Sequence, residues 1–226
     1  MRTISRIIRK IMKAAAALLM TAAAILTAVL VYFGIKGYEM YEKAVTEVPV
    51  SMMYPRISSQ EGFARLGTLP EYYISAVIAA EDKRFYTHGG VDPAAIARAL
   101  WHDIKAGAPE QGGSTITQQL AKNFYFTQEK KLERKFAEIF AAFEIEQTYT
   151  KDGILEMYVG SIYFGSNYYG IGEAARGYFE KEPGELGEYE CALLAGIPNA
   201  PSVYSPDNDP ELAGQRAEQV IKMMEE

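Results

Sequence analysis

The chain opens with a long run of apolar positions. Residues 14–35 carry no charged side chain and are rich in alanine, leucine, valine and isoleucine. A run of this length can cross a bilayer as a helix. Five basic residues and no acidic residue precede it, so the positive-inside rule places residues 1–13 in the cytoplasm and everything after the anchor outside. A cleaved signal peptide is the alternative, although its apolar core is usually shorter.

The hydrophobic pattern changes after the anchor. Residues 36–68 are punctuated by prolines and have weak helical periodicity, which predicts a stalk leading into the domain. From residue 69 onward, apolar positions recur at helical spacing and strand-like alternation is scarce. We therefore predict a mainly α domain over residues 69–226. Its predicted helices cover residues 71–80, 93–107, 114–123, 132–148, 151–158, 189–196 and 211–224.

Charge and cysteine content narrow the functional classes. Five of the 23 basic residues precede residue 14, so the rest of the chain has 18 bases against 29 acids, a net charge of about −11. Such a surface does not suit general nucleic-acid binding. The single cysteine, Cys191, excludes an intramolecular disulfide. It lies in an apolar run, whereas reactive cysteines need polar, basic surroundings, so we predict a buried core residue.

A dense polar cluster, residues 81–92, follows the first predicted domain helix. Glu81 ends that helix, where the negative end of the helix dipole should raise the pKa of its carboxyl group. A carboxylate of raised pKa suits a general base. Asp92 and Pro93 then have the pattern of an N-cap and first helical residue. For this segment alone, a solvated loop after a helix end is an equally good interpretation.

A second polar segment spans residues 112–123. Thr115 and Gln118 have capping-box spacing, while Ser114, Gln118 and Lys122 are four residues apart and share a helix face. A glycine pair, free backbone N–H groups and a lysine one turn along suit a phosphate or pyrophosphate. An ordinary capped amphipathic helix is the alternative.

The third segment is the helix predicted over residues 132–148. Arg134 and Lys135 lie four and three residues before Glu138, which is the usual spacing of a solvated, salt-bridged face. The helix is otherwise apolar nearly all round, so charges on it need partners or a function. Glu138 is therefore a candidate for a second active-site carboxylate. Two further segments, residues 151–165 and 195–206, have the pattern of structural helices and turns.

Taken together and in this order, the five segments resemble the peptidoglycan glycosyltransferases of family fifty-one. That family includes monofunctional transglycosylases and the N-terminal domains of class A penicillin-binding proteins. The resemblance covers roughly residues 49–224. It implies a lysozyme-like head lobe with a small membrane-proximal jaw lobe, the jaw lying between the first two segments and around residues 124–126. The implied location is the bacterial cytoplasmic membrane, with a single pass and the N-terminus inside.

The resemblance also implies an activity, the polymerisation of lipid II into glycan strands. The 4-hydroxyl of the lipid II GlcNAc would attack the anomeric carbon of an undecaprenyl-pyrophosphate-linked donor, with inversion. Glu81 would be the general base. Glu138 would lie near the departing pyrophosphate, through a divalent metal such as Mg²⁺ or Mn²⁺, and no organic cofactor is expected. Membrane lipid and transpeptidases or other wall-synthesis proteins are further implied partners; nucleic acid is not.

Other residues receive roles through the same resemblance. His88 and Asp92 would support the loop that aims Glu81. Cations would neutralise the pyrophosphate oxygens, and polar side chains would hold sugar or phosphate groups. The implied substrate-binding residues are Lys83, Arg84, Ser114, Gln118, Gln119, Lys122, Asn123, Lys130, Arg134 and Lys135.

Two positions depart from the family pattern. The usual Tyr-Leu-Asn is Tyr-Val-Gly at residues 158–160, and losing the asparagine removes a polar contact and adds backbone freedom. Lys130 stands where arginine is frequent, which keeps the charge but loses bidentate phosphate binding. Neither change touches the two glutamates, so we expect activity, slower or dependent on a partner.

Three alternatives stay open. A lysozyme-like muramidase or lytic transglycosylase would share the fold and one glutamate, but would not need the pyrophosphate cations. A non-catalytic scaffold would keep the domain without its chemistry. The chain ends where the family's glycosyltransferase domain ends, which favours a monofunctional enzyme; a truncated bifunctional protein is the other interpretation.

Overall fold

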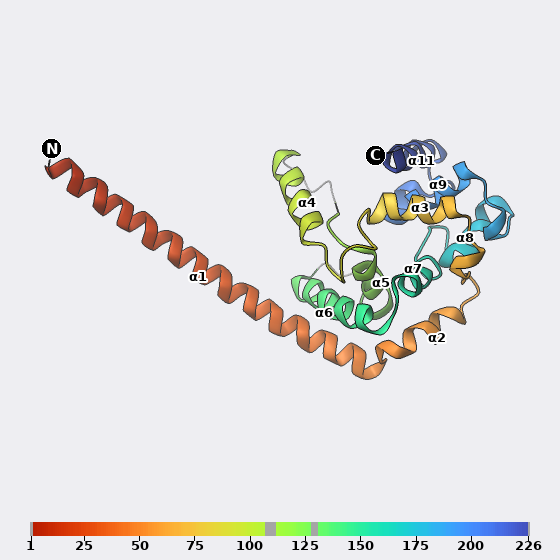
Figure 1. The fold of residues 1–226 in the computed structure, drawn as a ribbon, viewed down its shortest axis with the longest axis horizontal. Coiled ribbons are helices and arrows are strands. Elements are labelled where there is room, and N and C mark those ends of the chain that lie inside the picture. Colours follow the sequence, from red (N-terminus) through yellow and green to blue (C-terminus); the bar gives the residue numbers. More distant parts are fainter. Residues whose placement is uncertain (1, 107–111, 128–130, 226) are drawn as a thin grey trace.

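The computed structural model describes residues 2–106, 112–127 and 131–225 (Figure 1). Within these ranges the regular structure is helical, apart from an isolated β-bridge between Tyr163 and Tyr169. The prediction of a mainly α domain is therefore confirmed. The helices are α1 (Arg2–Glu47), α2 (Met53–Ser58), α3 (Glu71–Glu81), α4 (Pro93–Ala106), α5 (Ile116–Tyr125), α6 (Leu132–Thr148), α7 (Lys151–Val159), α8 (Gly170–Phe179), α9 (Glu188–Gly196), α10 (Pro201–Tyr204) and α11 (Pro210–Glu225).

Helix α1 is the predicted membrane anchor, and it is longer than predicted. It is long and apolar enough to cross a bilayer, and its most apolar window is not buried against the rest of the protein. It continues without a break to Glu47, so residues 36–47 are helix rather than a weakly helical stalk. Tertiary packing explains the difference, because Tyr38 and Tyr41 on this stretch pack against Phe140 of α6.

The following residues belong to the domain rather than to a stalk. Val50, Met53 and Ile57 are fully buried in the main core. Glu156 of α7 fastens the same segment, since its carboxylate accepts hydrogen bonds from the Tyr54 hydroxyl at 2.6 Å and from the Leu66 backbone at 2.7 Å. The core therefore begins some twenty residues before the boundary predicted at residue 69.

The core is formed by helices from both ends of the chain. Helices α3, α9 and α11 pack on one another, and α5 packs on α6 and α7 (Figure 1). Helix α7 contributes several large, fully buried side chains, including Leu155, Met157 and Tyr158. Cys191 of α9 is buried as predicted, and burial raises the pKa of its thiol to about 11.

Helix α8 was not predicted. Its three glycines lower its intrinsic helix propensity, but tertiary packing requires them. A Cβ at Gly172 would lie 2.9 Å from the Gly62 carbonyl oxygen, and one at Gly177 would lie 2.2 Å from the Tyr168 ring. Gly170 starts the helix at a φ of 78°, a left-handed conformation that favours glycine.

Helix α4 stands apart from the main group of helices (Figure 1). It lies in the segment where the resemblance places the jaw, and its Trp101 is 74% exposed. The division into a head lobe and a jaw lobe stays a prediction.

Candidate active site

The carboxyl group of Glu81 is held by a relay from two neighbouring helices. Its Oε2 accepts a hydrogen bond of 2.7 Å from Nε2 of Gln119 on α5. The Gln119 Oε1 in turn accepts a bond of 3.1 Å from the hydroxyl of the buried Tyr158 on α7. The other oxygen of Glu81, Oε1, is buried and has no hydrogen-bond partner among the described residues. An oriented carboxyl with one unpartnered oxygen is suited to accept a proton.

Burial raises the pKa of the Glu81 carboxyl above its ordinary value. The Gln119 hydrogen bond and the positive charges of Arg216 and Lys122 act in the opposite direction. The predicted direction of the shift therefore agrees with the structure, but its main cause is desolvation rather than the helix dipole. Arg216, an 8% exposed residue of α11, was not singled out from the sequence. In the sequence, Arg216 is marked only by being a charged residue among the apolar positions of the last helix.

Asp82 organises the start of the polar loop. It is 8% exposed and accepts hydrogen bonds from His88 Nε2 at 2.8 Å and from the Ile116 backbone N–H at 3.1 Å. These contacts tie the end of α3 to the loop and to the start of α5. Asp82 is next to Glu81 in the sequence, but no role was predicted for it.

His88 and Asp92 were both predicted to support this loop, and within it they have different partners. Asp92 is occupied by other donors: Nε of Arg84 at 2.9 Å and the backbone N–H groups of Ala94 and Ala95 at 2.9 and 3.0 Å. The Arg84 hydrogen bond, with the backbone donors, holds the pKa of Asp92 far below its ordinary value. Arg84, predicted to bind substrate, thus has its charge engaged within the loop.

The predicted capping box is present at the start of α5. Thr115 Oγ1 accepts from the Gln118 N–H, and Gln118 Oε1 accepts from the Thr115 N–H, both at 3.1 Å. Thr115 also donates to the Gly90 carbonyl at 2.7 Å, joining the first two polar segments. Gln118 is 1% exposed, so its side chain serves the helix start. Its predicted substrate contact stays a prediction, while its neighbour Gln119 faces Glu81.

Glu138 lies at the centre of a cluster of cations. It is 1% exposed and pairs with Arg134 and, at 2.9 Å, with Lys135. Lys135 also donates to Ser114 Oγ at 2.6 Å. The partly buried Lys122 lies within electrostatic reach of this group and of Glu81, and burial lowers the pKa of its amine. Three cations around one carboxylate leave a surplus of positive charge that favours an anion.

A divalent metal does not fit Glu138 in this arrangement. Arg134 occupies one carboxylate oxygen and Lys135 the other, and a metal ion would meet their positive charge. Among the described residues, the group with metal-ligand spacing is Asp82, His88 and Asp92. Asp82 and His88 already bind each other, and Asp92 binds Arg84 and the backbone.

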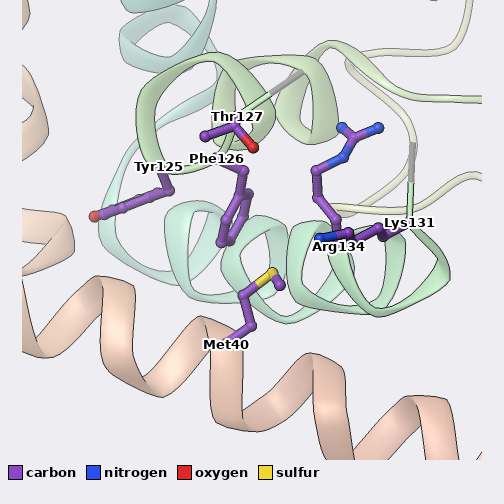
Figure 2. Close-up of a pocket in the computed structure, with 6 residues that line it drawn as sticks. All are labelled: Met40, Tyr125, Phe126, Thr127, Lys131 and Arg134. Atoms are coloured by element: carbon purple, nitrogen blue, oxygen red, sulfur yellow. The ribbon is translucent and has the colours of Figure 1, made fainter. Parts of the chain in front are cut away.

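A pocket of about 210 Å³ adjoins the cation cluster on the side of the anchor (Figure 2). Met40 of α1 and Phe126, just after α5, point toward one another across it, and Arg134 links it to Glu138. Its lining combines apolar and cationic side chains: Met40, Tyr125, Phe126, Thr127, Lys131 and Arg134.

The remaining predicted substrate-binding residues are Lys83, Asn123 and Lys130. Lys83 and Asn123 are exposed. Lys130 falls outside the described residues. Gly160 has ordinary backbone angles, and a Cβ there would lie 2.6 Å from Cδ2 of Phe63. Space for Phe63, rather than added backbone freedom, is thus the consequence of glycine at this position.

A desolvated carboxylate and a surplus of cations, in a helical domain that follows a long apolar helix, are suited to the displacement of an anionic leaving group. A family model described as Transglycosylase matches residues 50–225. The chain belongs to this family, which confirms the predicted resemblance.

Similar proteins carry the name penicillin-binding protein 1A. The one from Neisseria cinerea is 50% identical over 162 residues, covering 72% of this chain and 20% of the relative. The one from Aquifex aeolicus is 47% identical over 173 residues, covering 76% of this chain and 24% of the relative. The chain thus spans about a fifth to a quarter of the length of these relatives.

Proposed function

We propose that this domain polymerises lipid II into peptidoglycan glycan strands by inverting glycosyl transfer. The proposal rests on one observation, namely that the domain contains two different electrostatic environments. On one side is the desolvated Glu81 with an unpartnered Oε1. On the other is the cation surplus around Glu138, and Lys122 lies within electrostatic reach of both.

Glu81 acts as the general base. Its Oε1 takes the proton of the acceptor's 4-hydroxyl as that oxygen forms a bond to the anomeric carbon of the donor. The bond from that carbon to the pyrophosphate oxygen breaks, and the pyrophosphate leaves with the electron pair. Attack from the face opposite the leaving group inverts the configuration. The hydrogen bond from Gln119 keeps the carboxyl aimed during this transfer.

The cation cluster receives the leaving group. Lys122, Arg134 and Lys135 supply positive charge where negative charge develops on the pyrophosphate. Glu138 holds Arg134 and Lys135 in place, and it is a positioning residue rather than a metal ligand. The pocket between Met40 and Phe126 suits the first part of the prenyl chain, because it is apolar and opens beside Arg134.

The orientation of the anchor follows from its charges. Basic residues before the membrane-spanning stretch place the N-terminus inside, so that the domain works on the outer face of the cytoplasmic membrane. Membrane lipid and wall-synthesis enzymes such as transpeptidases are its expected neighbours.

Detergent-solubilised protein and labelled lipid II provide the test. Polymer from the wild type and none from Glu81→Gln is the expected result, with Glu218→Gln, a change on the last helix, as the matched control. Cleavage of finished glycan strands without polymerisation would instead indicate the muramidase or lytic activity. Neither activity, with binding of wall-synthesis enzymes intact, would indicate a scaffold. Activity that persists in EDTA is expected, and strong inhibition reversed by Mg²⁺ or Mn²⁺ would restore the metal to Glu138.

A further inference from the structure

Helix α6 presents two different faces to two different partners. Successive residues of an α-helix are rotated by about 100°, at 3.6 residues per turn. Arg134, Lys135 and Glu138 therefore share one side of α6, and they form the cation cluster. The opposite side carries the residues that contact α1, namely Glu133, Phe136, Ala137, Phe140 and Glu144.

The contact between α1 and α6 is closest at Gly37. A Cβ on this residue would lie 2.3 Å from the Phe136 Cβ, 2.8 Å from the Glu133 carbonyl oxygen and 3.0 Å from the Ala137 nitrogen. Two of these atoms are backbone, so they cannot move aside as a flexible side chain would. Only glycine lets the two helix backbones approach this closely.

Aromatic and polar side chains extend the contact between α1 and α6 along α1 after Gly37. The Tyr38 ring meets the Phe140 ring edge-on at 5.4 Å between centroids. The Tyr41 hydroxyl donates to Glu144, and burial together with this hydrogen bond raises the pKa of the phenol well above its ordinary value. Among the described elements, α6 makes its most extensive contact with α1.

We propose that Gly37 is a positioning residue for the cation cluster, acting through the close contact of α1 with α6. Helix α1 has no break between its membrane-spanning part and this contact, so the contact fixes the height and tilt of α6 above the bilayer. A substrate anchored in the membrane presents its phosphates at a set depth. The cation cluster must lie at the same depth to contact these phosphates. This inference rests on the proposed function.

The chain offers a matched control one turn earlier. A Cβ at Gly34 would have no heavy atom within 4 Å. Gly34→Leu and Gly37→Leu thus make the same chemical change on the same helix, and only the second separates α1 from α6. Gly37→Ala adds the Cβ alone and should give a smaller effect in the same direction.

Spin labels measure the position of α6 directly. Leu132 and Phe143 are exposed near its two ends, so Leu132→Cys and Phe143→Cys accept a nitroxide, while Cys191 is buried. In full-length protein reconstituted in liposomes, collision with oxygen and with a water-soluble nickel complex reports the depth of each label. We expect Gly37→Leu to move both labels and Gly34→Leu to leave them in place.

Kinetics supply the second measurement. A misplacement of 1 Å can cost about 10²-fold in rate, so we expect kcat/KM for membrane-held lipid II to fall at least about tenfold in Gly37→Leu. A water-soluble, short-chain analogue should lose much less, because it does not depend on bilayer depth. Equal losses for both substrates, or labels that stay in place, would overturn the proposal. An inactive wild type would contradict the proposed function alone, since label depth does not require turnover.

Discussion

Gln119 binds Glu81 through one carboxylate oxygen and leaves the other, Oε1, without a partner. The amide is itself held by Tyr158, so the direction of the base is set by a side chain from the buried centre of the domain. Neither contact could be read from sequence spacing, because the three residues come from different helices.

Replacing Gln119 should make Glu81 a less efficient base and change its pKa. The Gln119 hydrogen bond lowers the pKa of Glu81, so Gln119→Leu should raise that pKa. A base works only when ionised, and the acid side of the pH–rate profile should therefore move to higher pH. We also expect kcat to fall by about 10- to 10²-fold, within the usual contribution of a positioned base. Tyr158→Phe, one step further away, should shift the profile less.

The buried Glu81 carboxylate should also lower the free energy of unfolding at neutral pH. Its pKa is raised in the folded state, so the folded protein resists ionisation that the unfolded chain accepts. This cost is absent below the ordinary glutamate pKa and grows as the pH rises through the folded value. Glu81→Gln should therefore raise Tm at pH 7, and thermal unfolding would measure the gain. An equal gain at pH 3 would contradict burial of a charge as the cause.

Lys122 should impose an alkaline limit. Burial lowers the pKa of its amine below the ordinary 10.5, so its positive charge is lost as the pH rises through that lowered value. Polymerisation should then fall on the alkaline side before an ordinary lysine would titrate. Lys122→Arg should abolish this fall in rate at alkaline pH, since arginine stays charged. Lys122→Met should lose about 10²-fold or more in kcat at neutral pH, where the wild-type lysine is charged.

Asp82 and His88 should behave as one unit. Both side chains are almost fully buried and hydrogen-bonded to each other, and breaking such a pair typically costs about 3 kcal/mol. Asp82→Asn and His88→Gln should each lower the free energy of unfolding, and the double variant should cost much less than their sum. Asp152→Asn, which removes the charge from the group that accepts a hydrogen bond from the exposed Tyr86 hydroxyl, is the control and should cost under about 1 kcal/mol.

Restoring the family's asparagine at position 160 should destabilise this chain. Gly160→Asn places a Cβ against Phe63 and the Glu156 carbonyl oxygen, and overpacking of this kind costs about 1–3 kcal/mol. Phe63→Leu should recover part of the loss in the double variant, which thermal unfolding would detect. A variant Gly160→Asn as stable as the wild type would show that Phe63 moves aside freely.

Much of the fold could be predicted because its signals are local. The capping box of Thr115 and the N-cap of Asp92 need only neighbouring residues, and the bounds of α6 follow its own pattern. Helix α8 and the end of α1 could not be predicted, because tertiary contacts override weak propensity there. The same division applies to the site. Glu81, Lys122 and Glu138 stand in visible motifs, whereas the role of Gln119 and the nearness of Arg216 depend on which helices meet.

The unbroken course of α1 limits how far the domain can travel. Residues 36–47 add only about 18 Å beyond the membrane stretch, at 1.5 Å per residue. In the orientation proposed for the anchor, the domain would not search the space outside the cell as a flexibly tethered domain would. It can only drift within the plane of the bilayer, so encounters with other membrane-held molecules become a two-dimensional search, governed by lateral density rather than by bulk concentration.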